Sequence, residues 1–211
     1  RLLAELAQVA PAAERPAVLL ELGRLEAGVL DEPARAVGRF EAVAAAWPDD
    51  PEPRRRLASL CLRLDRPADA VEHFEAVERL YAEEGWAEPQ GAFHLAMARA
   101  LRGRGDPDAA LARLERAVAV DPDLDAAHAL ARDLMLERGH LEGIVEWSAE
   151  AAGRATAPTL QAQLLATAGR LAWRELKQAG RAAGILDEAL ALRPDDAELG
   201  RLRLEVATAL G

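Results

Sequence analysis

The chain has 211 residues, a length that fits one or two ordinary domains or about five to six helical repeats. Ala, Leu, Glu and Arg dominate the composition and only 4% of residues are aromatic, which excludes a sheet-rich protein and predicts an all-α chain. The formal net charge of −10 argues against a nucleic-acid partner, which would require a basic excess.

Cysteine usage and hydropathy restrict the class further. Cys61 is the single cysteine, so an intrachain disulfide framework is excluded and a reducing compartment is compatible with the sequence. No apolar run approaches the ~20 residues of a membrane span, and we expect no membrane insertion. The chain begins at Arg1 rather than Met, which indicates a fragment, and a cytoplasmic location is the expectation.

In chain order, the sequence predicts single helices at both ends and five helix pairs between them. Pro, Gly-Asp-Pro and Asp-Pro steps mark the helix boundaries. Residues 1–11 are expected to be the trailing helix of an upstream repeat, and residues 195–211 a terminal or capping helix. The pairs are expected at residues 16–48, 52–84, 88–122, 123–157 and 158–194.

Each expected pair carries the same pattern of residue sizes. The first helix, called helix A, has one small residue near its middle: Gly23, Ala58, Ala98, Ala131 and Gly169. The second, helix B, has a small residue followed four positions later by a large one: Ala36/Phe40, Ala70/Phe74, Ala110/Leu114, Gly143/Trp147 and Ala182/Leu186. Small residues let two helices approach closely, and the large residue fills the space beside them.

These motifs resemble the tetratricopeptide repeat (TPR) family, in the degenerate form of bacterial-type arrays. Helix A of that family has a Leu-Gly pair, seen here at Leu22-Gly23, and helix B an A-x3-F pair, seen at Ala36/Phe40. A closing proline follows helix B at Pro48, Pro122 and Pro194. The resemblance covers nearly the whole chain and implies a right-handed α-solenoid of antiparallel helix pairs that forms a single superhelical domain.

Three departures from the family pattern stand out. Glu26 occupies a position where the family usually has Tyr. The fourth pair is the least regular, so its register at Gly143 is open to a shift of one residue. Two insertions are needed, one in the connection 83–89 and one that lengthens the helix from about Pro158.

The residue types needed for catalysis or metal binding are not arranged for either role. Cys61 falls on the packed face of its helix with no histidine at helical spacing, and the four histidines lack metal-ligand spacing. Neither serine lies in a nucleophile elbow, and no phosphate-binding glycine loop is present. We therefore expect no enzymatic activity, no catalytic residue, no metal and no cofactor.

The TPR resemblance implies that helix A faces line a groove for a partner segment. Arginine recurs in the positions expected to face it, and the candidate residues are Arg24, Arg55, Ser59, Arg63, Arg99, His128, Arg132, Arg170 and Arg174. Arginine binds carboxylates through two parallel hydrogen bonds, so this column favours an acidic or C-terminal segment. The alternative is that each arginine only pairs with a neighbouring Glu. The family's chaperone-tail clamp needs Lys and Asn, and this chain has one Lys and no Asn.

Trp86, in the connection 83–89, allows two interpretations: contact with a partner, or packing back over the gap that the insertion creates. The leading functional hypothesis is a non-catalytic scaffold or adaptor for a protein or peptide partner. A structural subunit of a larger, self-associating assembly and a regulatory arm of a larger enzyme remain alternatives.

Overall fold

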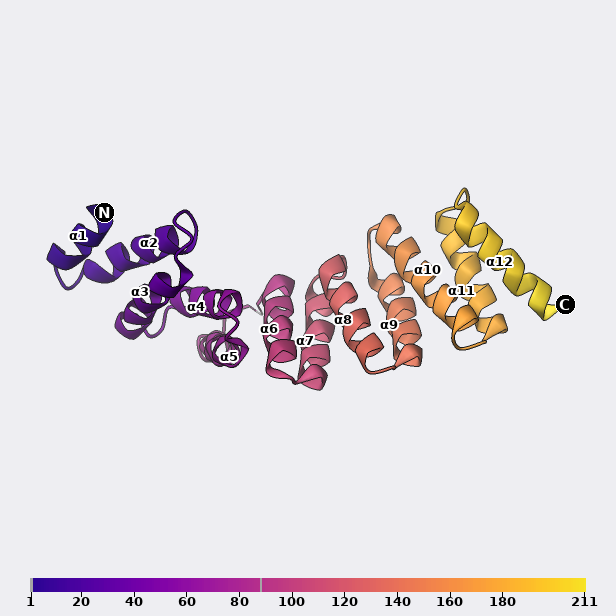
Figure 1. The fold of residues 1–211 in the computed structure, drawn as a ribbon, viewed down its shortest axis with the longest axis horizontal. Coiled ribbons are helices and arrows are strands. Elements are labelled where there is room, and N and C mark those ends of the chain that lie inside the picture. Colours follow the sequence, from indigo (N-terminus) through magenta and orange to yellow (C-terminus); the bar gives the residue numbers. More distant parts are fainter. Residues whose placement is uncertain (1, 88) are drawn as a thin grey trace. The chain divides into compact units, whose positions relative to one another are not determined.

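The computed structural model describes residues 2–87 and 89–211, which form twelve α-helices and no β-strand (Figure 1). The prediction of an all-α chain is therefore confirmed. In chain order the helices are α1 (Leu2–Val9), α2 (Arg15–Ala27), α3 (Pro33–Ala46), α4 (Pro51–Arg63), α5 (Pro67–Glu83), α6 (Gly91–Arg104), α7 (Pro107–Val120), α8 (Asp125–Glu137), α9 (Leu141–Arg154), α10 (Pro158–Arg174), α11 (Ala179–Leu192) and α12 (Ala197–Leu210).

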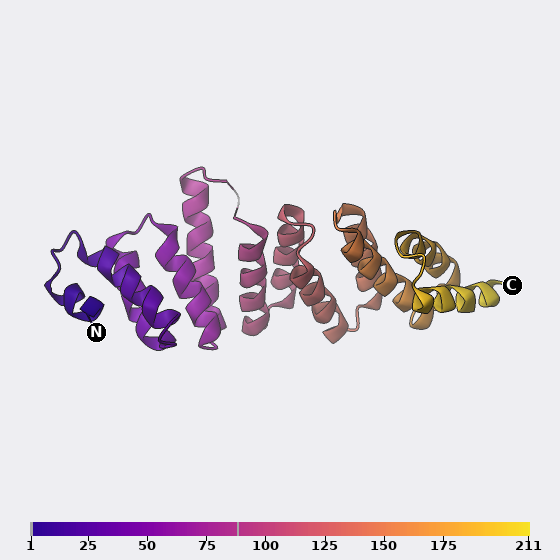
Figure 2. The same cartoon turned by 90° about the horizontal axis from the view of Figure 1, so that it is seen from above.

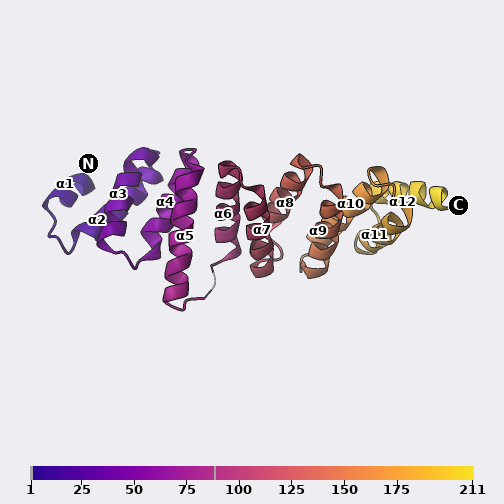
Figure 3. The same cartoon turned by 90° about the horizontal axis from the view of Figure 1, so that it is seen from below.

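The helices belong to two compact units. One contains α1–α5 and residues Ala96–Ala110, and the other contains Gln90–Leu95 and Leu111–Gly211. In the first unit α2 packs on α3, α3 on α4 and α4 on α5, and in the second each helix from α8 to α12 packs on the next (Figures 2 and 3). Because the connections are short, helices that pack consecutively run in opposite directions.

Every turn from helix A to helix B has one residue in the left-handed backbone region, two positions before helix B begins. Gly105 and Gly139 supply it in two turns, with φ of 85° and 68°. Asp31, Asp65 and Lys177 supply it in the others, with φ between 51° and 58°. Aspartate tolerates this region better than most residues because its short side chain can hydrogen-bond locally. The shared position aligns the five pairs independently of side-chain size.

This alignment corrects the register predicted for the fourth pair, which placed the small and large residues at Gly143 and Trp147. Five residues after the left-handed residue the other pairs have alanine, but α9 has Ile144, which is fully buried. Nine residues after it the other pairs have Phe or Leu, but α9 has Ser148, which is 3% exposed. Trp147 is only half-buried. In α9 the large residue comes first and the small residue four positions later, the reverse of the other pairs. The predicted positions, Gly143 and Trp147, therefore each lie one residue before the true ones.

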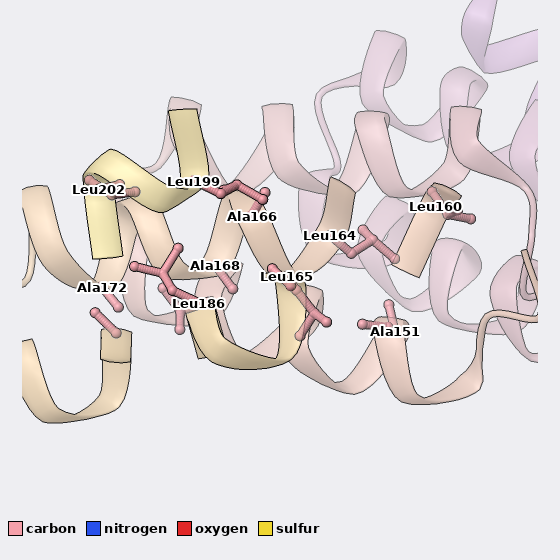
Figure 4. Close-up of a cluster of buried hydrophobic side chains, with 14 of the residues drawn as sticks. Ala151, Leu160, Leu164, Leu165, Ala166, Ala168, Ala172, Leu186, Leu199 and Leu202 are labelled. Carbon is pink, nitrogen blue, oxygen red and sulfur yellow. The ribbon is translucent and has the colours of Figure 1, made fainter. Parts of the chain in front are cut away.

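Close contact between the small helix A residues and the large helix B residues is present where glycine permits it. A Cβ atom on Gly23 would lie 3.0 Å from Phe40 Cζ, and one on Gly169 would lie 2.7 Å from Leu186 Cδ2. Phe40 and Leu186 are both fully buried. Leu186 belongs to a cluster of buried side chains from α9, α10, α11 and α12 (Figure 4). The glycines therefore set how closely these helices approach.

Glu26, the acid in place of the family's Tyr, is accommodated by an ion pair. It is 5% exposed, and Arg39 Nε on α3 donates to its carboxylate over 3.3 Å. The backbone oxygen of Glu26 also accepts a hydrogen bond of 2.7 Å from Glu32 N in the following turn. Helices α2 and α3 are thus joined by polar contacts at a position where an aromatic ring is usual.

The two insertions both lengthen helices. Helix α10 has 17 residues whereas α4 has 13, a difference of one turn. Helix α5 also has 17 residues, so the insertion expected in the connection 83–89 lies partly inside α5. Glu88 of that connection is outside the described residues.

One aspartate caps the start of α4 and another the start of α12. Asp50 accepts a hydrogen bond from Glu52 N at the start of α4, and Asp196 accepts from Glu198 N and Leu199 N at the start of α12. None of the helices in residues 2–87 and 89–211 combines the length and apolarity that crossing a membrane requires.

A different aspartate, Asp123, ties two connections together. It lies between α7 and α8, and its carboxylate accepts hydrogen bonds from Thr156 N at 2.8 Å and Ala157 N at 3.1 Å, between α9 and α10. The Thr156 hydroxyl donates to the same carboxylate. The hydrogen bond from the Thr156 side chain, followed by those from the two backbone N–H groups, lowers the pKa of Asp123 below its ordinary value.

We expect Asp123→Ala to lower the melting temperature of the chain at neutral pH because three hydrogen bonds to a carboxylate are lost. A carboxyl group whose pKa is lower in the folded chain stabilises it above the unfolded pKa, and this contribution disappears as the pH falls through the folded pKa. The difference between variant and wild type should therefore narrow below about pH 3.8, the ordinary pKa of the group. Thermal unfolding followed by circular dichroism, at pH values from neutral to below 3.8, measures this difference in melting temperature. Asp195→Ala is the control, since Asp195 makes no hydrogen bond with the described residues, and an equal loss in both variants would contradict the role of Asp123.

Candidate partner-binding site

Six of the nine residues predicted to face a groove line two separate hollows, one in each unit. The first, called the α2–α4 hollow, has a volume of about 210 Å³. Its lining is Arg24, Ala27, Gly28, Phe40, Arg56, Ser59, Leu60 and Arg63. The second, called the α8–α10 hollow, has a volume of about 360 Å³. Its lining is Asp125, His128, Ala129, Arg132, Ser148, Leu160, Gln163, Leu164, Ala166, Thr167, Arg170 and Arg193.

Acids from the same unit hold the arginines of the α2–α4 hollow. Arg24 donates to Glu21 at 2.6 Å and more weakly to Glu52 at 3.5 Å. Arg56 Nε donates to Glu52 at 2.8 Å. Burial alone would raise the pKa of Glu52, but the hydrogen bond from Arg56 and the charges of Arg56, Arg55 and Arg24 outweigh it and leave the pKa below its ordinary value.

Arg63 joins α4 to the end of α2. One guanidinium nitrogen donates to the backbone oxygen of Ala27 at 2.6 Å, and the other donates to Asp31 at 2.6 Å. Ala27 is the last residue of α2, so the arginine satisfies a carbonyl group that has no partner within its own helix. Arg63 therefore has a structural role in this hollow in addition to its charge.

His128 lies in the wall of the α8–α10 hollow and is 4% exposed. Its Nε2 atom is 2.9 Å from the backbone oxygen of Pro122, and Trp147 Nε1 donates to its Nδ1 atom at 3.2 Å. Because Nδ1 accepts a hydrogen bond from the indole N–H, the ring proton is on Nε2, which donates a hydrogen bond to the backbone oxygen of Pro122. The Trp147 and His128 rings meet edge to face, with centroids 6.2 Å apart. The histidine ring is thus fixed in one orientation.

The arginines of the α8–α10 hollow form fewer hydrogen bonds and ion pairs with the rest of the chain than those of the α2–α4 hollow do. Arg170 contacts Glu198 over 3.3 Å, and its Nε atom is buried with no hydrogen-bond acceptor among the described residues. Arg132 reaches only its chain neighbour Asp133, at 3.2 Å. Arg193 makes a shorter ion pair of 2.6 Å with Asp196. A buried donor without an acceptor costs about 1–3 kcal/mol, so Arg170 is the residue that gains most from an added acceptor.

Three of the arginines that were predicted to face a groove lie outside both hollows. Arg55, Arg99 and Arg174 are exposed and form no ion pair with the described residues. The alternative that each arginine of the column pairs with a neighbouring acid therefore describes Arg24, Arg63, Arg132 and Arg170, but not these three.

The spacing on helix A does not predict Arg56 or Arg193, although each lines a hollow. Arg56 directly follows the predicted Arg55, and it is Arg56 that lines the α2–α4 hollow. Arg193 follows the end of α11 and reaches the hollow from a connection, which a pattern confined to helix A could not detect.

Trp86 packs against its own helix end and keeps an exposed edge. Its ring meets Tyr81 of α5 edge to face, with centroids 5.3 Å apart, and its backbone N–H donates to Tyr81 O at 3.0 Å. The side chain nevertheless remains 44% exposed. Both interpretations of Trp86 are compatible with this placement.

The part of the chain that the structure describes contains no group of three or more His, Cys, Asp and Glu side chains able to hold a metal ion. Cys61 is 1% exposed in the core, and burial raises the pKa of its thiol, which keeps it in the unreactive protonated form.

Comparisons with known proteins point to one fold. The family model described as tetratricopeptide repeat matches residues 91–133. Among curated proteins, no sequence match was found. The crystal structure of YrrB, described as a TPR protein with an unusual peptide-binding site, is 16% identical with a TM-score of 0.61, over 99% of this chain and 98% of that one.

Two further solved structures give the same result. A TPR repeats protein from Bacteroides fragilis is 15% identical with a TM-score of 0.64, over 92% of this chain and 98% of that one. The protein MamA is 16% identical with a TM-score of 0.63, over 88% of this chain and 96% of that one. At these identities the likeness shows a shared fold.

Proposed function

Because residues 91–133 match a tetratricopeptide repeat and the chain has the fold of tetratricopeptide-repeat proteins, we propose that it is a non-catalytic scaffold that binds an acidic segment of a partner protein. Proteins with this fold generally serve protein–protein interaction, because stacked helix pairs present long surfaces for a partner. The finer part of the proposal concerns the α2–α4 and α8–α10 hollows.

The observation that carries the proposal is the charge of the hollow walls. Each hollow is lined by three arginines, although the whole chain has a net charge of −10. The lining of the α2–α4 hollow includes no acid, and that of the α8–α10 hollow includes only Asp125. The acids that pair with these arginines lie mainly outside the linings. A bound carboxylate can exchange with such exposed ion pairs, which are worth about 0–1 kcal/mol each.

The fold of YrrB, a TPR protein with a peptide-binding site, supports the idea that such an array can hold an extended peptide. For this chain we propose an extended acidic segment whose side chains or C-terminus meet the hollow arginines.

A selection from a random displayed peptide library tests this proposal. Binding to the chain should enrich Asp and Glu over their frequency in the starting library, and the enrichment should diminish at high salt. The same selection on an Arg132→Glu/Arg170→Glu variant is expected to lose the acidic preference. Enrichment of basic or purely apolar peptides, or no enrichment at all, contradicts the proposal.

A further inference from the structure

The geometry points to a subsite for a single carboxylate in the α8–α10 hollow, in the space left open by Ser148. This inference rests on the proposed function and narrows it to one position in the chain. It identifies which residues receive the anionic group.

The space arises from the exchange of large and small residues in α9. The position nine residues after the left-handed turn residue carries a large side chain in the other pairs: Phe40, Phe74, Leu114 and Leu186. In α9 it carries Ser148, which lines the hollow. The large side chain of this pair is Ile144, four positions earlier, which is fully buried and does not line the hollow. The exchange keeps α9 packed while it opens a space beside α8 and α10.

The charged groups of this space are three arginines and one acid, Asp125. Arg132 and Arg170 line it from α8 and α10, and Arg193 lines it from the end of α11. Arg170 Nε is buried without an acceptor among the described residues. A carboxylate offers two oxygen atoms with several acceptor positions, which matches this set of donors.

The α2–α4 hollow differs on this point although it also has three arginines. There Arg63 already donates to Ala27 O and Asp31, and Arg24 and Arg56 donate to Glu21 and Glu52. The three arginines of the α8–α10 hollow also meet acids of the chain, but Arg170 Nε is left without an acceptor among the described residues. The α8–α10 hollow therefore has the stronger requirement for an external carboxylate.

The hollow contains its own spectroscopic reporter. Trp147 Nε1 donates to His128 Nδ1, and His128 is part of the hollow wall. A carboxylate that enters beside His128 alters the environment of this hydrogen bond. The indole N–H resonance of Trp147, assigned with the variant Trp147→Phe, should therefore shift when the subsite is filled.

The experiment titrates the whole chain with three synthetic peptides and follows this resonance in a nitrogen–proton correlation spectrum. The first is a capped alanine peptide with one central glutamate, the second has glutamine in its place, and the third has no acidic side chain but a free C-terminus. We expect a saturable shift with the first or third peptide and none with the second. The responding peptide shows whether the carboxylate comes from a side chain or from a chain terminus.

Two variants and a control complete the test. Ser148→Leu should weaken peptide binding at least about tenfold by filling the hollow, and its circular dichroism spectrum checks that it folds with the large Ile144 in the same helix. Arg170→Gln should weaken binding to a similar extent without filling it. Ser59→Leu makes the same substitution in the α2–α4 hollow and should leave the Trp147 response unchanged.

The subsite is overturned if the Trp147 resonance does not move with either carboxylate, or if Ser148→Leu and Arg170→Gln bind as wild type does. Failure of the proposed function has a different signature, in which no displayed peptide binds the chain at any position. Acidic peptides that bind without disturbing Trp147 therefore disprove the subsite and leave the scaffold function standing.

Discussion

Replacing Phe40 with alanine is expected to lower the free energy of unfolding of the first unit by about 3–5 kcal/mol, the usual cost of removing a buried aromatic ring. Phe40 is fully buried, and its ring lies 3.0 Å from where a Cβ on Gly23 would be. The ring therefore fills the space between α2 and α3, and its removal leaves a cavity that the closely packed helices cannot easily close. Urea unfolding followed by circular dichroism measures the change.

Val29→Ala provides the comparison for this prediction. Val29 belongs to the same unit but is 79% exposed in the turn after α2. Its truncation should change the free energy of unfolding by less than about 0.5 kcal/mol. Equal losses in the two variants would show that the small-and-large packing of α2 and α3 does not stabilise the unit.

Gly169→Val is expected to lower the free energy of unfolding of the second unit by about 2–3 kcal/mol, because it overpacks a dense interface. A Cβ at this position would lie 2.7 Å from Leu186 Cδ2 and 2.8 Å from Leu186 Cγ, well inside van der Waals contact. Leu186 is fully buried among side chains of α9–α12 and has little room to move away (Figure 4). Chemical unfolding of wild type and variant gives the difference.

A matched control and a double mutant separate this clash from the general effect of valine. Gly184→Val on α11 should be neutral or slightly stabilising, since nothing lies within 4 Å of a Cβ there and valine favours a helix more than glycine does. Combining Gly169→Val with Leu186→Ala should cost at least about 1 kcal/mol less than the sum of the two single effects. Strict additivity would mean that the two residues do not clash.

The helix pairs could be predicted from the sequence because their boundaries depend on local chemistry. Proline begins α3, α4, α5, α7 and α10, and a proline cannot continue a preceding helix. Asp50 and Asp196 cap the helices that follow them. Gly105 and Gly139 adopt the left-handed conformation that glycine permits. Each of these signals acts within a few residues.

The register of α9 could not be obtained in the same way. The pattern of a small residue followed by a large one fits Gly143 and Trp147, yet the buried positions are Ile144 and Ser148. Size complementarity is satisfied across helices, so a large and a small residue can exchange places without any local sign. Only the backbone position of Gly139 reveals the true alignment.

Spacing along helix A selects seven arginines, but it does not predict how they divide between two hollows or which acids they meet. Arg24, Arg63, Arg132 and Arg170 line a hollow, whereas the other three line neither. Two of these arginines meet acids about 30 positions away, in the contacts of Arg63 with Asp31 and of Arg170 with Glu198. Such contacts have no signature in a single sequence.

The central claim is that arginines in the hollows bind the acidic groups of a partner segment, and a charge exchange tests it most directly. Isothermal titration would compare wild type with the Arg132→Glu/Arg170→Glu variant, using one selected acidic peptide and a second peptide in which its acids are replaced by lysine. We predict that the variant loses at least about tenfold in affinity for the acidic peptide and gains affinity for the lysine peptide. Equal affinity of wild type and variant for the acidic peptide would contradict the claim.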